Sequence, residues 1–374
     1  MSVSEHRKRL YETLPENSLV ICHAGVPLHT NEDHYYHPFE ANSQFFWLTG
    51  LERENMVFLA AKVNGETQEL LFIEPVDPNL ERWTGKMPTA EEASAASGIE
   101  QVRMVGDLSA VIGRYMGRYR IEQVFFDLYR CGENDLPDLN VLKAKEFTEK
   151  YLAAALRDLH AACVPLREVK DAEEVALIRE AIGITRQGLD RVMKTLKPGM
   201  KEYQAQAEFE YACRALGAEK LAFPTISASG LNGCMMHYET NRDEIRDGSL
   251  LLMDLGAKYG NYCSDITRTF PADGAYSPRQ KEVYNLVLKA NLAVAEAALS
   301  LGAGRTQLTD EIDPLAGVEL LVRRGDAVQP GQPIARLYAK KKATCLPAAA
   351  EMVVSALAQT ETPPAERPSI LAQF

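Results

Sequence analysis

Two aspartates, Asp254 and Asp265, are the residues whose type and spacing most plainly suggest chemistry. They lie eleven positions apart in the run LLLMDLGAKYGNYCSDITRTF, at the ends of two predicted strands that follow one another along the chain. Hard carboxylate oxygens brought together suit divalent cations such as Mn²⁺, Co²⁺ or Mg²⁺. Aspartates at strand ends are also common turn residues, so the pair by itself is only the beginning of a metal site.

Further metal ligands are scarce near this pair. The sequence has seven histidines and His237 is the last of them, so no imidazole follows the aspartates. Cys263 stands between the two aspartates and offers a thiolate, but a small buried strand residue is the simpler interpretation. His34 and His37, in EDHYYHP, have a spacing compatible with a metal, although a polar loop is the simpler account of them.

Length and composition limit the class of protein. A chain of 374 residues with 25% charged and 46% hydrophobic residues is typical of a globular protein of two or three domains. The net charge of −11 argues against a nucleic-acid or anionic-membrane partner. No segment approaches the roughly 18 apolar residues of a membrane span, and the N-terminus lacks the apolar core of a signal peptide. Seven cysteines without paired spacing predict free thiols and a cytoplasmic location.

The elements that must position the aspartates begin after an N-terminal α/β region. Up to about residue 160, short apolar runs predict strands at 57–62, 69–75 and 123–128, and helical periodicity predicts helices at 91–98 and 108–116. This alternation indicates an α/β sheet domain.

A second region follows a boundary near 163–171. Asp171 and Glu174 form a predicted capping box that opens a long helix ending near LKPGM, and a second helix ends at Gly217. The remaining predicted elements are strands at 223–229, 249–257 and 262–270 and a helix at 277–299. The pattern changes again after Gly302, where residues 317–339 alternate as antiparallel strands with Gly325 and Gly331 at turns.

The run HYETNRDEIRDGSLLLMDLGAKYGNYCSDITRTFP resembles the first half of the catalytic domain of Xaa-Pro aminopeptidases and dipeptidases, the creatinase-like "pita-bread" metallopeptidases. The segments FEANSQFFWLTGLE and FIEPVDPNLERWTGK resemble the N-terminal domain of the same family, so the resemblance covers about residues 1–295. It implies two divalent metals, Mn²⁺ or another, with Asp254 binding one and Asp265 bridging both. It also implies that His237 is the catalytic histidine that contacts the substrate, a proline-containing peptide.

The second half of the family pattern is missing from this sequence. The family takes its remaining ligands from a histidine in an HGxGHxxGxxxHD-like motif, a glutamate in an EPG segment and a glutamate in a RIEDD segment, and this sequence contains none of these. Two carboxylates do not supply a dinuclear site. The resemblance therefore predicts weak or absent metal binding and little or no activity.

In place of that half stands the segment ALSLGAGRTQLTDEIDPLAGVELLVRRGDAVQPGQPIARLYA, with LGAGR, an IDP turn and a V-x-x-G-D-x-V-x-x-G-x-P hairpin. On these motifs, residues from about 297 to 374 resemble the C-terminal domain of pyrimidine-nucleoside phosphorylases, a small β-rich domain of the barrel-sandwich-hybrid type. The predicted domains are therefore an aminopeptidase P-like α/β domain at 1–165, an α+β pita-bread half domain at 166–298 and a phosphorylase-like domain at 299–374. The two resemblances meet near residues 293–300, as in a fused or chimeric chain.

Three functions follow from these patterns. The first is an Xaa-Pro aminopeptidase-like protein with an incomplete site. The second is a non-catalytic binding or dimerisation module, since families of both resemblances form dimers and a homo-oligomer is expected. The third is a protein related to pyrimidine-nucleoside phosphorylase, which the tail alone suggests, because no phosphate-binding Gly-rich loop precedes it.

Overall fold

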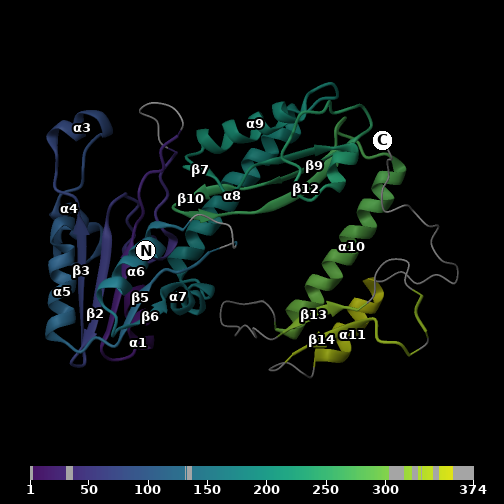
Figure 1. The fold of residues 1–374 in the computed structure, drawn as a ribbon. Helices are drawn as coiled ribbons and strands as arrows, with labels where there is room; N and C mark the ends of the chain where they lie inside the picture. The colour runs from purple at the N-terminus through teal and green to yellow at the C-terminus, as the bar shows by residue number, and fades with distance from the viewer. Residues whose placement is uncertain are drawn as a thin grey trace. The chain divides into compact units, whose positions relative to one another are not determined.

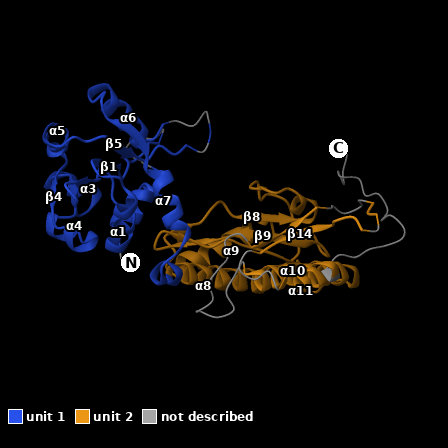
Figure 2. Cartoon of the chain, turned by 90° about the horizontal axis from the view of Figure 1, so that it is seen from below, with its two compact units in different colours: residues 1–176 blue, residues 177–374 orange. Residues whose placement is uncertain are grey.

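The computed structural model describes residues 3–30, 37–130, 132, 137–302, 316–321, 327–329, 331–339 and 345–356. The chain divides into two compact units, residues 1–176 and 177–374, coloured separately in Figure 2. None of the described helices is long and apolar enough to cross a membrane.

Unit 1 is built on a six-stranded sheet in the order β4-β3-β2-β1-β5-β6 (Figure 1). The strand β1 pairs parallel with β5, and β5 with β6, whereas the pairs β1–β2 and β2–β3 are antiparallel. The strands are β1 (Ser18–His23), β2 (Val57–Val63), β3 (Glu66–Ile73), β4 (Val102–Met104), β5 (Gln123–Phe126) and β6 (Ala155–Asp158). The three strands predicted from the sequence in this region are thus confirmed.

Helices cover both faces of this sheet because successive strand residues point in opposite directions. Val20 and Cys22 of β1 pack into one core, and Leu19 and Ile21 into the other. The helices are α1 (Val3–Thr13), α2 (Ser43–Thr49), α3 (Pro78–Thr84), α4 (Ala90–Ser97), α5 (Leu108–Arg118), α6 (Leu139–Lys150) and α7 (Leu159–Glu168), with a 3₁₀ turn η1 (Val105–Asp107). Residues of α1, α2, α4 and α7 join the first core, and those of α5 and α6 the second. The predicted α/β domain is therefore a three-layer sandwich.

Most of the helix α8 (Ala172–Thr195) belongs to unit 2, and the helix begins at the predicted capping box. Asp171 accepts a hydrogen bond from the backbone of Glu174, and the Glu174 side chain accepts one from the backbone of Asp171. The other elements before residue 278 are α9 (Glu202–Ala215), β7 (Lys220–Leu221), β8 (Ile226–Ser229), a 3₁₀ helix η2 (Gly230–Cys234), β9 (Leu250–Leu255), β10 (Ala257–Tyr259), β11 (Tyr262–Cys263) and β12 (Ile266–Pro271).

Two small sheets, β12-β9-β8 and β11-β10-β7, carry the strands of unit 2 that precede residue 278. Alternate residues of β9, Leu251, Met253 and Leu255, enter a core shared with α8 and α9. Gly188 of α8 lies against the ring of Phe209 of α9, so closely that a Cβ at this position would meet the ring at 2.7 Å. The predicted strand at 249–257 is divided at Gly256, which lies between the end of β9 and the start of β10.

The helix α10 (Pro278–Leu301) extends two residues beyond its predicted end. Its last turns, with Ala297 and Leu301, pack against α11 (Leu346–Ala356) and the antiparallel pair β13 (Gly317–Leu320) and β14 (Ala335–Tyr338). The earlier turns of α10 expose a series of large apolar side chains: Val283, Tyr284, Leu286, Val287, Leu288 and Leu292. The predicted turn at Gly331 is present with a φ of 83°, and Gly325 lies outside the described residues.

Six cysteines lie in the described part of the chain and none of them forms a disulfide. Cys22 and Cys163 are buried in unit 1 and Cys213 in unit 2, and burial raises the thiol pKa of each, to about 12 for Cys163 and Cys213. Cys234 and Cys263 are exposed.

Candidate metal centre

The strand pair β9–β12 brings the two aspartates together. Asp254 lies opposite Thr267 in the antiparallel register, and Asp265 immediately precedes β12. Because side chains alternate along a strand, the residue two before Thr267 is on the same face as Asp254. The carboxylates of Asp254 and Asp265 lie close enough there for the negative charge of Asp254 to raise the pKa of Asp265. The core residues of β9 occupy the opposite face.

A close approach of two backbones fixes the start of this pair. A Cβ on Gly256 would overlap the carbonyl oxygen of Ser264, so only glycine fits at this position. Next to this backbone contact, the hydroxyl oxygens of Thr185 and Ser264 lie 2.6 Å apart, and both accept a hydrogen bond from the backbone N–H of Ala257. Thr185 belongs to α8 and is fully buried. A buried hydroxyl pair thus positions the residue that precedes Asp265.

The electrostatics of the two carboxylates suit a cation. Loss of hydration, then the negative charge of Asp254 and the hydrogen bond to it, raise the pKa of Asp265. Thr267 Oγ1 donates to Asp254 Oδ1 at 2.8 Å and orients that carboxylate. A bound divalent cation relieves the repulsion in such a pair. The pair therefore fits a cation as two hard ligands, and among the described residues it belongs to no group of three possible ligands.

Cys263 does not occupy the buried position expected for it. The side chain is exposed, because β11 is a two-residue strand at the edge of its sheet. The prediction of a buried strand residue is wrong, and the thiolate alternative stays a prediction.

Within the described ranges, one group of three possible ligands lies close together, and it is in unit 1. It consists of His6, Asp171 and Glu174. His6 Nε2 is 3.0 Å from Asp171 Oδ2, and the ring stacks on Trp47 with centroids 4.4 Å apart. Asp171 and Glu174 cap α8. Burial alone would raise the pKa of Asp171, but the hydrogen bonds that its carboxylate accepts from the α8 backbone and from His6 outweigh burial and lower this pKa. This group is accounted for as a helix cap.

His237 lies on the loop between η2 and β9, with its side chain exposed. It does not form a three-ligand group with Asp254 and Asp265 among the residues that the structure describes. Its loop is nevertheless fixed. The next residue, Tyr238, is buried, and its hydroxyl donates to Glu202 Oε2 at 2.8 Å.

Glu202 is the centre of the network that holds this loop. This fully buried carboxylate, in the first turn of α9, accepts hydrogen bonds from five donors. They are the backbone N–H and hydroxyl of Ser229, the Asn232 amide, the Tyr238 hydroxyl and the Asp243 backbone N–H. Burial opposes ionisation, but the hydrogen bonds from Asn232, Ser229 and Tyr238 outweigh it and hold the pKa of Glu202 below its ordinary value.

Asn241 fixes the other end of the loop. The residue is buried and its backbone φ is 48°. Its side-chain amide accepts a hydrogen bond from the backbone N–H of Ser227 in β8 and donates one to the backbone carbonyl of Thr225, directly before β8. Asparagine tolerates this left-handed conformation better than most residues. In the motif HYETN, the Tyr and Asn thus point inward as anchors, and the His points outward. The sequence predicted a role for His237 but not for Glu202 or Asn241. The only local signals for these two are an acid in the first turn of a predicted helix and an Asn in a loop.

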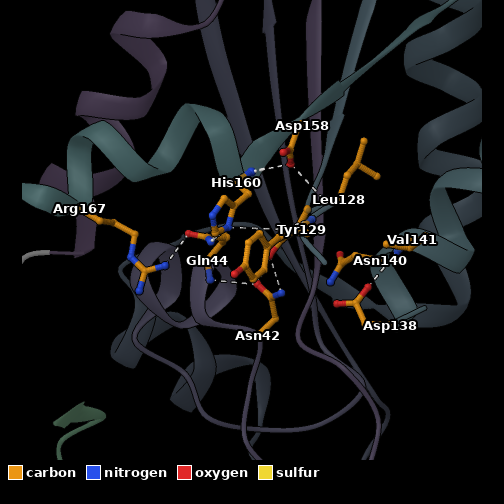
Figure 3. Close-up of polar contacts among 12 residues, drawn as sticks. Asn42, Gln44, Leu128, Tyr129, Asp138, Asn140, Val141, Asp158, His160 and Arg167 are labelled. Atoms are coloured by element: carbon orange, nitrogen blue, oxygen red, sulfur yellow. Dashed lines mark hydrogen bonds and ion pairs between the residues drawn. The ribbon is translucent and has the colours of Figure 1, made fainter. Parts of the chain in front are cut away.

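A second polar cluster lies in unit 1 at the carboxyl ends of β5 and β6 (Figure 3). His160 stacks on Tyr129 with ring centroids 4.1 Å apart, and its Nδ1 lies 3.0 Å from the Gln44 amide nitrogen. Arg167 donates to Gln44 Oε1 at 2.8 Å. The nearby Asp127, whose pKa is raised by burial, accepts from Asn42 Nδ2 at 2.7 Å. The members of this cluster bond one another, which ties α2 and α7 to the end of β5.

Other predictions for single residues have mixed outcomes. Trp47 and Phe45 of the run QFFWLTG are buried in the unit 1 core, whereas Phe46 is half-buried. His37 is exposed on a loop, as expected, and His34 lies outside the described residues.

Three family models match this chain. Metallopeptidase family M24 matches residues 176–316, the aminopeptidase P N-terminal domain matches residues 3–125, and the pyrimidine nucleoside phosphorylase C-terminal domain matches residues 288–358. The second and third models agree with the resemblances seen at the two ends of the sequence. The M24 and phosphorylase models overlap over residues 288–316.

Known proteins resemble the chain over most of its length. An Xaa-Pro aminopeptidase from Haemophilus influenzae is 27% identical over 325 residues, or 86% of this chain and 73% of that protein. One from Escherichia coli is 30% identical over 76% of this chain and 64% of its own length. A solved structure assigned as an aminopeptidase P from Bacillus anthracis is 34% identical, with a TM-score of 0.75, over 79% of this chain and 70% of that one. The chain thus spans about two thirds to three quarters of these relatives.

Proposed function

The chain belongs to metallopeptidase family M24 as an Xaa-Pro aminopeptidase-like protein, and we propose that its catalytic domain is incomplete, so that the chain alone has little or no peptidase activity. The observation that carries the proposal is the ligand set. Asp254 and Asp265 form a close carboxylate pair, yet no histidine follows His237 in the sequence and no EPG or RIEDD segment is present.

The proposed roles follow the family resemblance. Asp254 and Asp265 would be the residues that hold divalent metal, Mn²⁺ or another. His237 would contact a peptide with proline in second position and stabilise negative charge that develops on its scissile carbonyl. Bound metal would supply a nucleophilic hydroxide and polarise that carbonyl. This chain's own residues provide two carboxylates on one face and a histidine on an anchored loop, which is too few ligands for a two-metal site.

We propose three domains, at residues 1–165, 166–298 and 299–374, with a fusion near 293–300. The overlap of the M24 and phosphorylase models at 288–316 supports a join in this region. α10 runs through it without a break. A helix from each parent with similar composition explains such continuity. The barrel-sandwich hybrid proposed for the last domain is supported by the phosphorylase match and by the antiparallel pair β13–β14.

Calorimetric titration of the pure full-length chain with Mn²⁺, paired with an X-Pro peptide cleavage assay and an Asp254→Asn control, tests the proposal. The expected result is weak or absent binding and no turnover. Tight binding of two metals with turnover, both lost in Asp254→Asn, would show that the missing ligands come from elsewhere and would overturn the incomplete site.

A second function, a binding or assembly module, is favoured by the exposed apolar side chains of α10. Val287 is 64% exposed and Leu286 54%, and large apolar patches on a surface mark interaction sites. We propose a homo-oligomer that covers this helix. A monodisperse monomer in sedimentation equilibrium, with cooperative unfolding, would contradict this assignment.

The third function, nucleoside processing, rests on the match of residues 288–358 alone. If uridine or thymidine plus phosphate does not shift the unfolding temperature of the chain, this third function is wrong. A cytoplasmic location is proposed from the odd number of cysteines without paired spacing.

A further inference from the structure

Unit 1 contains a pocket that is separate from the aspartate pair. It has a volume of about 280 Å³ and lies where α5 and α6 cover the sheet. Ligand pockets range over about 300–1,000 Å³, so this one suits only a small molecule. Its floor is formed by β1 and β5 and its walls by the two helices. The lining includes Ser109 and Ile112 of α5, His23 at the end of β1, Lys143, Glu146, Phe147 and Lys150 of α6, and Tyr151 directly after α6.

His23 is the polar group in the floor of the pocket. The residue is 6% exposed, and its backbone is clamped on both sides by Asn140, which accepts from His23 N at 2.8 Å and donates to His23 O at 3.1 Å. Across the described part of the chain, no hydrogen bond reaches its imidazole. Burial, then the charge of Lys143, lowers the pKa of His23 to about 4. A neutral imidazole offers one donor and one acceptor, and both can serve a ligand in the pocket that His23 lines.

The walls of the pocket are aromatic. Phe147 lies between Phe126 and Tyr151, with ring centroids 5.7 Å and 4.8 Å away and tilted planes. Ile112 faces them from α5. Tilted aromatic side chains of this kind pack well against another ring, so the walls favour a planar apolar group.

The rim carries a surplus positive charge. Lys143 is neutralised by Glu146, whose carboxylate lies 2.8 Å from its ammonium group. Among the described residues, the ammonium group of Lys150 contacts the hydroxyl of Ser109, at 3.5 Å, and the face of Tyr151, whose ring centroid is 5.4 Å away. Lys150 and Ser109 therefore remain available to a carboxylate at the mouth of the pocket.

We propose that this pocket binds a small aromatic monocarboxylate that carries a polar group at the far end of its ring. The carboxylate meets Lys150 and Ser109, the ring lies between Ile112 and Phe147, and the polar group bonds to His23. The site lies wholly in unit 1 and uses none of Asp254, Asp265 and His237. The proposal is therefore independent of peptidase activity.

The test uses the full-length protein and 4-hydroxyphenylacetate as the probe, with phenylacetate and 4-hydroxyphenylethanol as its partial analogues. Binding is measured by calorimetry, and the imidazole ¹⁵N signals of His23, assigned from the spectrum of His23→Phe, are followed by NMR. The expected result is saturable binding with a shift of the His23 signals, and weaker binding of both analogues. No saturable binding up to several millimolar would overturn the proposal.

Three variants locate the ligand. Ile112→Trp fills the pocket and should abolish binding. Lys150→Gln should weaken binding about two- to fivefold, as expected for loss of an exposed ion pair, and Lys145→Gln, on the same helix but outside the lining, should leave it unchanged. His23→Phe should remove the preference for 4-hydroxyphenylacetate over phenylacetate. Binding that survives Ile112→Trp, or a preference that survives His23→Phe, would contradict the assignment. Thermal unfolding of each variant shows that it is folded, and the NMR shift in the unmodified protein does not depend on any variant.

Discussion

Tyr238 donates its phenolic hydrogen to the Glu202 carboxylate across 2.8 Å, at a site where Glu202 is fully shielded from solvent. The hydrogen bond ties the residue beside His237 to the first turn of α9. The loop that presents this histidine is therefore placed by a buried carboxylate 36 residues away in the sequence, independently of any metal.

Replacing Glu202 should destabilise unit 2. Glu202→Ala leaves buried donors from Ser229, Asn232 and Tyr238 without their acceptor, and the expected loss is about 2–3 kcal/mol in the free energy of unfolding. Urea unfolding monitored in unit 2 measures it. The matched control is Glu208→Ala, on the more exposed surface of the same helix, where the expected loss is within about 1 kcal/mol.

The same carboxylate predicts a dependence on pH. Because the folded-state pKa of Glu202 lies below its ordinary value near 4.5, its ionisation contributes stability that is complete above that value. This contribution should be lost as the pH falls through the lowered folded-state pKa. The stability difference between the unmodified protein and Glu202→Gln should therefore shrink on acidification below about pH 4.5. A difference that stays constant down to pH 3 would contradict this account.

Gly256→Ala should damage the aspartate pair through the backbone. The added Cβ overlaps the Ser264 carbonyl, so one of the two segments must move, at an expected cost of about 1–3 kcal/mol. Gly233→Ala is the control, because a Cβ there meets its nearest neighbours at 3.5 and 3.6 Å, which is ordinary contact. Thermal unfolding compares the two, and equal stability of both variants would show that the approach is not tight.

Asp254→Asn should lower the pKa of Asp265 towards its ordinary value near 3.8, because it removes the negative charge that helps to raise it. A raised folded-state pKa means that the metal-free protein loses stability as the pH rises through the window between the ordinary and the raised value. The variant should show a smaller loss in that window. Titration of the Asp265 carboxyl carbon by NMR gives the pKa directly, and an unchanged value would mean that the two carboxyls do not interact in solution.

Val287→Glu should weaken self-association. A charge in the middle of the exposed apolar residues of α10 must be desolvated when that helix is covered. Sedimentation equilibrium should show dissociation at a higher protein concentration than for the unmodified chain. Asn285→Glu, at an exposed polar position of the same helix, adds the same charge and should have a smaller effect. Equal effects of both variants would place the interface elsewhere.

Local patterns predicted much of this fold. The capping box of Asp171 and Glu174, the strands of unit 1 and the placement of Asp254 and Asp265 at neighbouring strand ends all depend on residues close together in the sequence. The anchors of the His237 loop depend on contacts between segments far apart, and Glu202 in particular looks like any surface acid of an amphipathic helix. The exposure of Cys263 was missed for a related reason, because whether a short strand lies at a sheet edge is decided by pairing and not by composition. The position of the His23 imidazole in the floor of a pocket likewise has no signature in the sequence.

The native cysteines can report how often each unit of this protein opens locally. Thiol reagents attack the thiolate, so the exposed Cys234 and Cys263 should react at once, whereas the buried thiols of Cys22, Cys163 and Cys213 should react only when their surroundings open. Two of these buried thiols report on unit 1 and one on unit 2. A single labelling time course resolved by mass spectrometry therefore ranks the two units by how often each one opens, without any engineered probe.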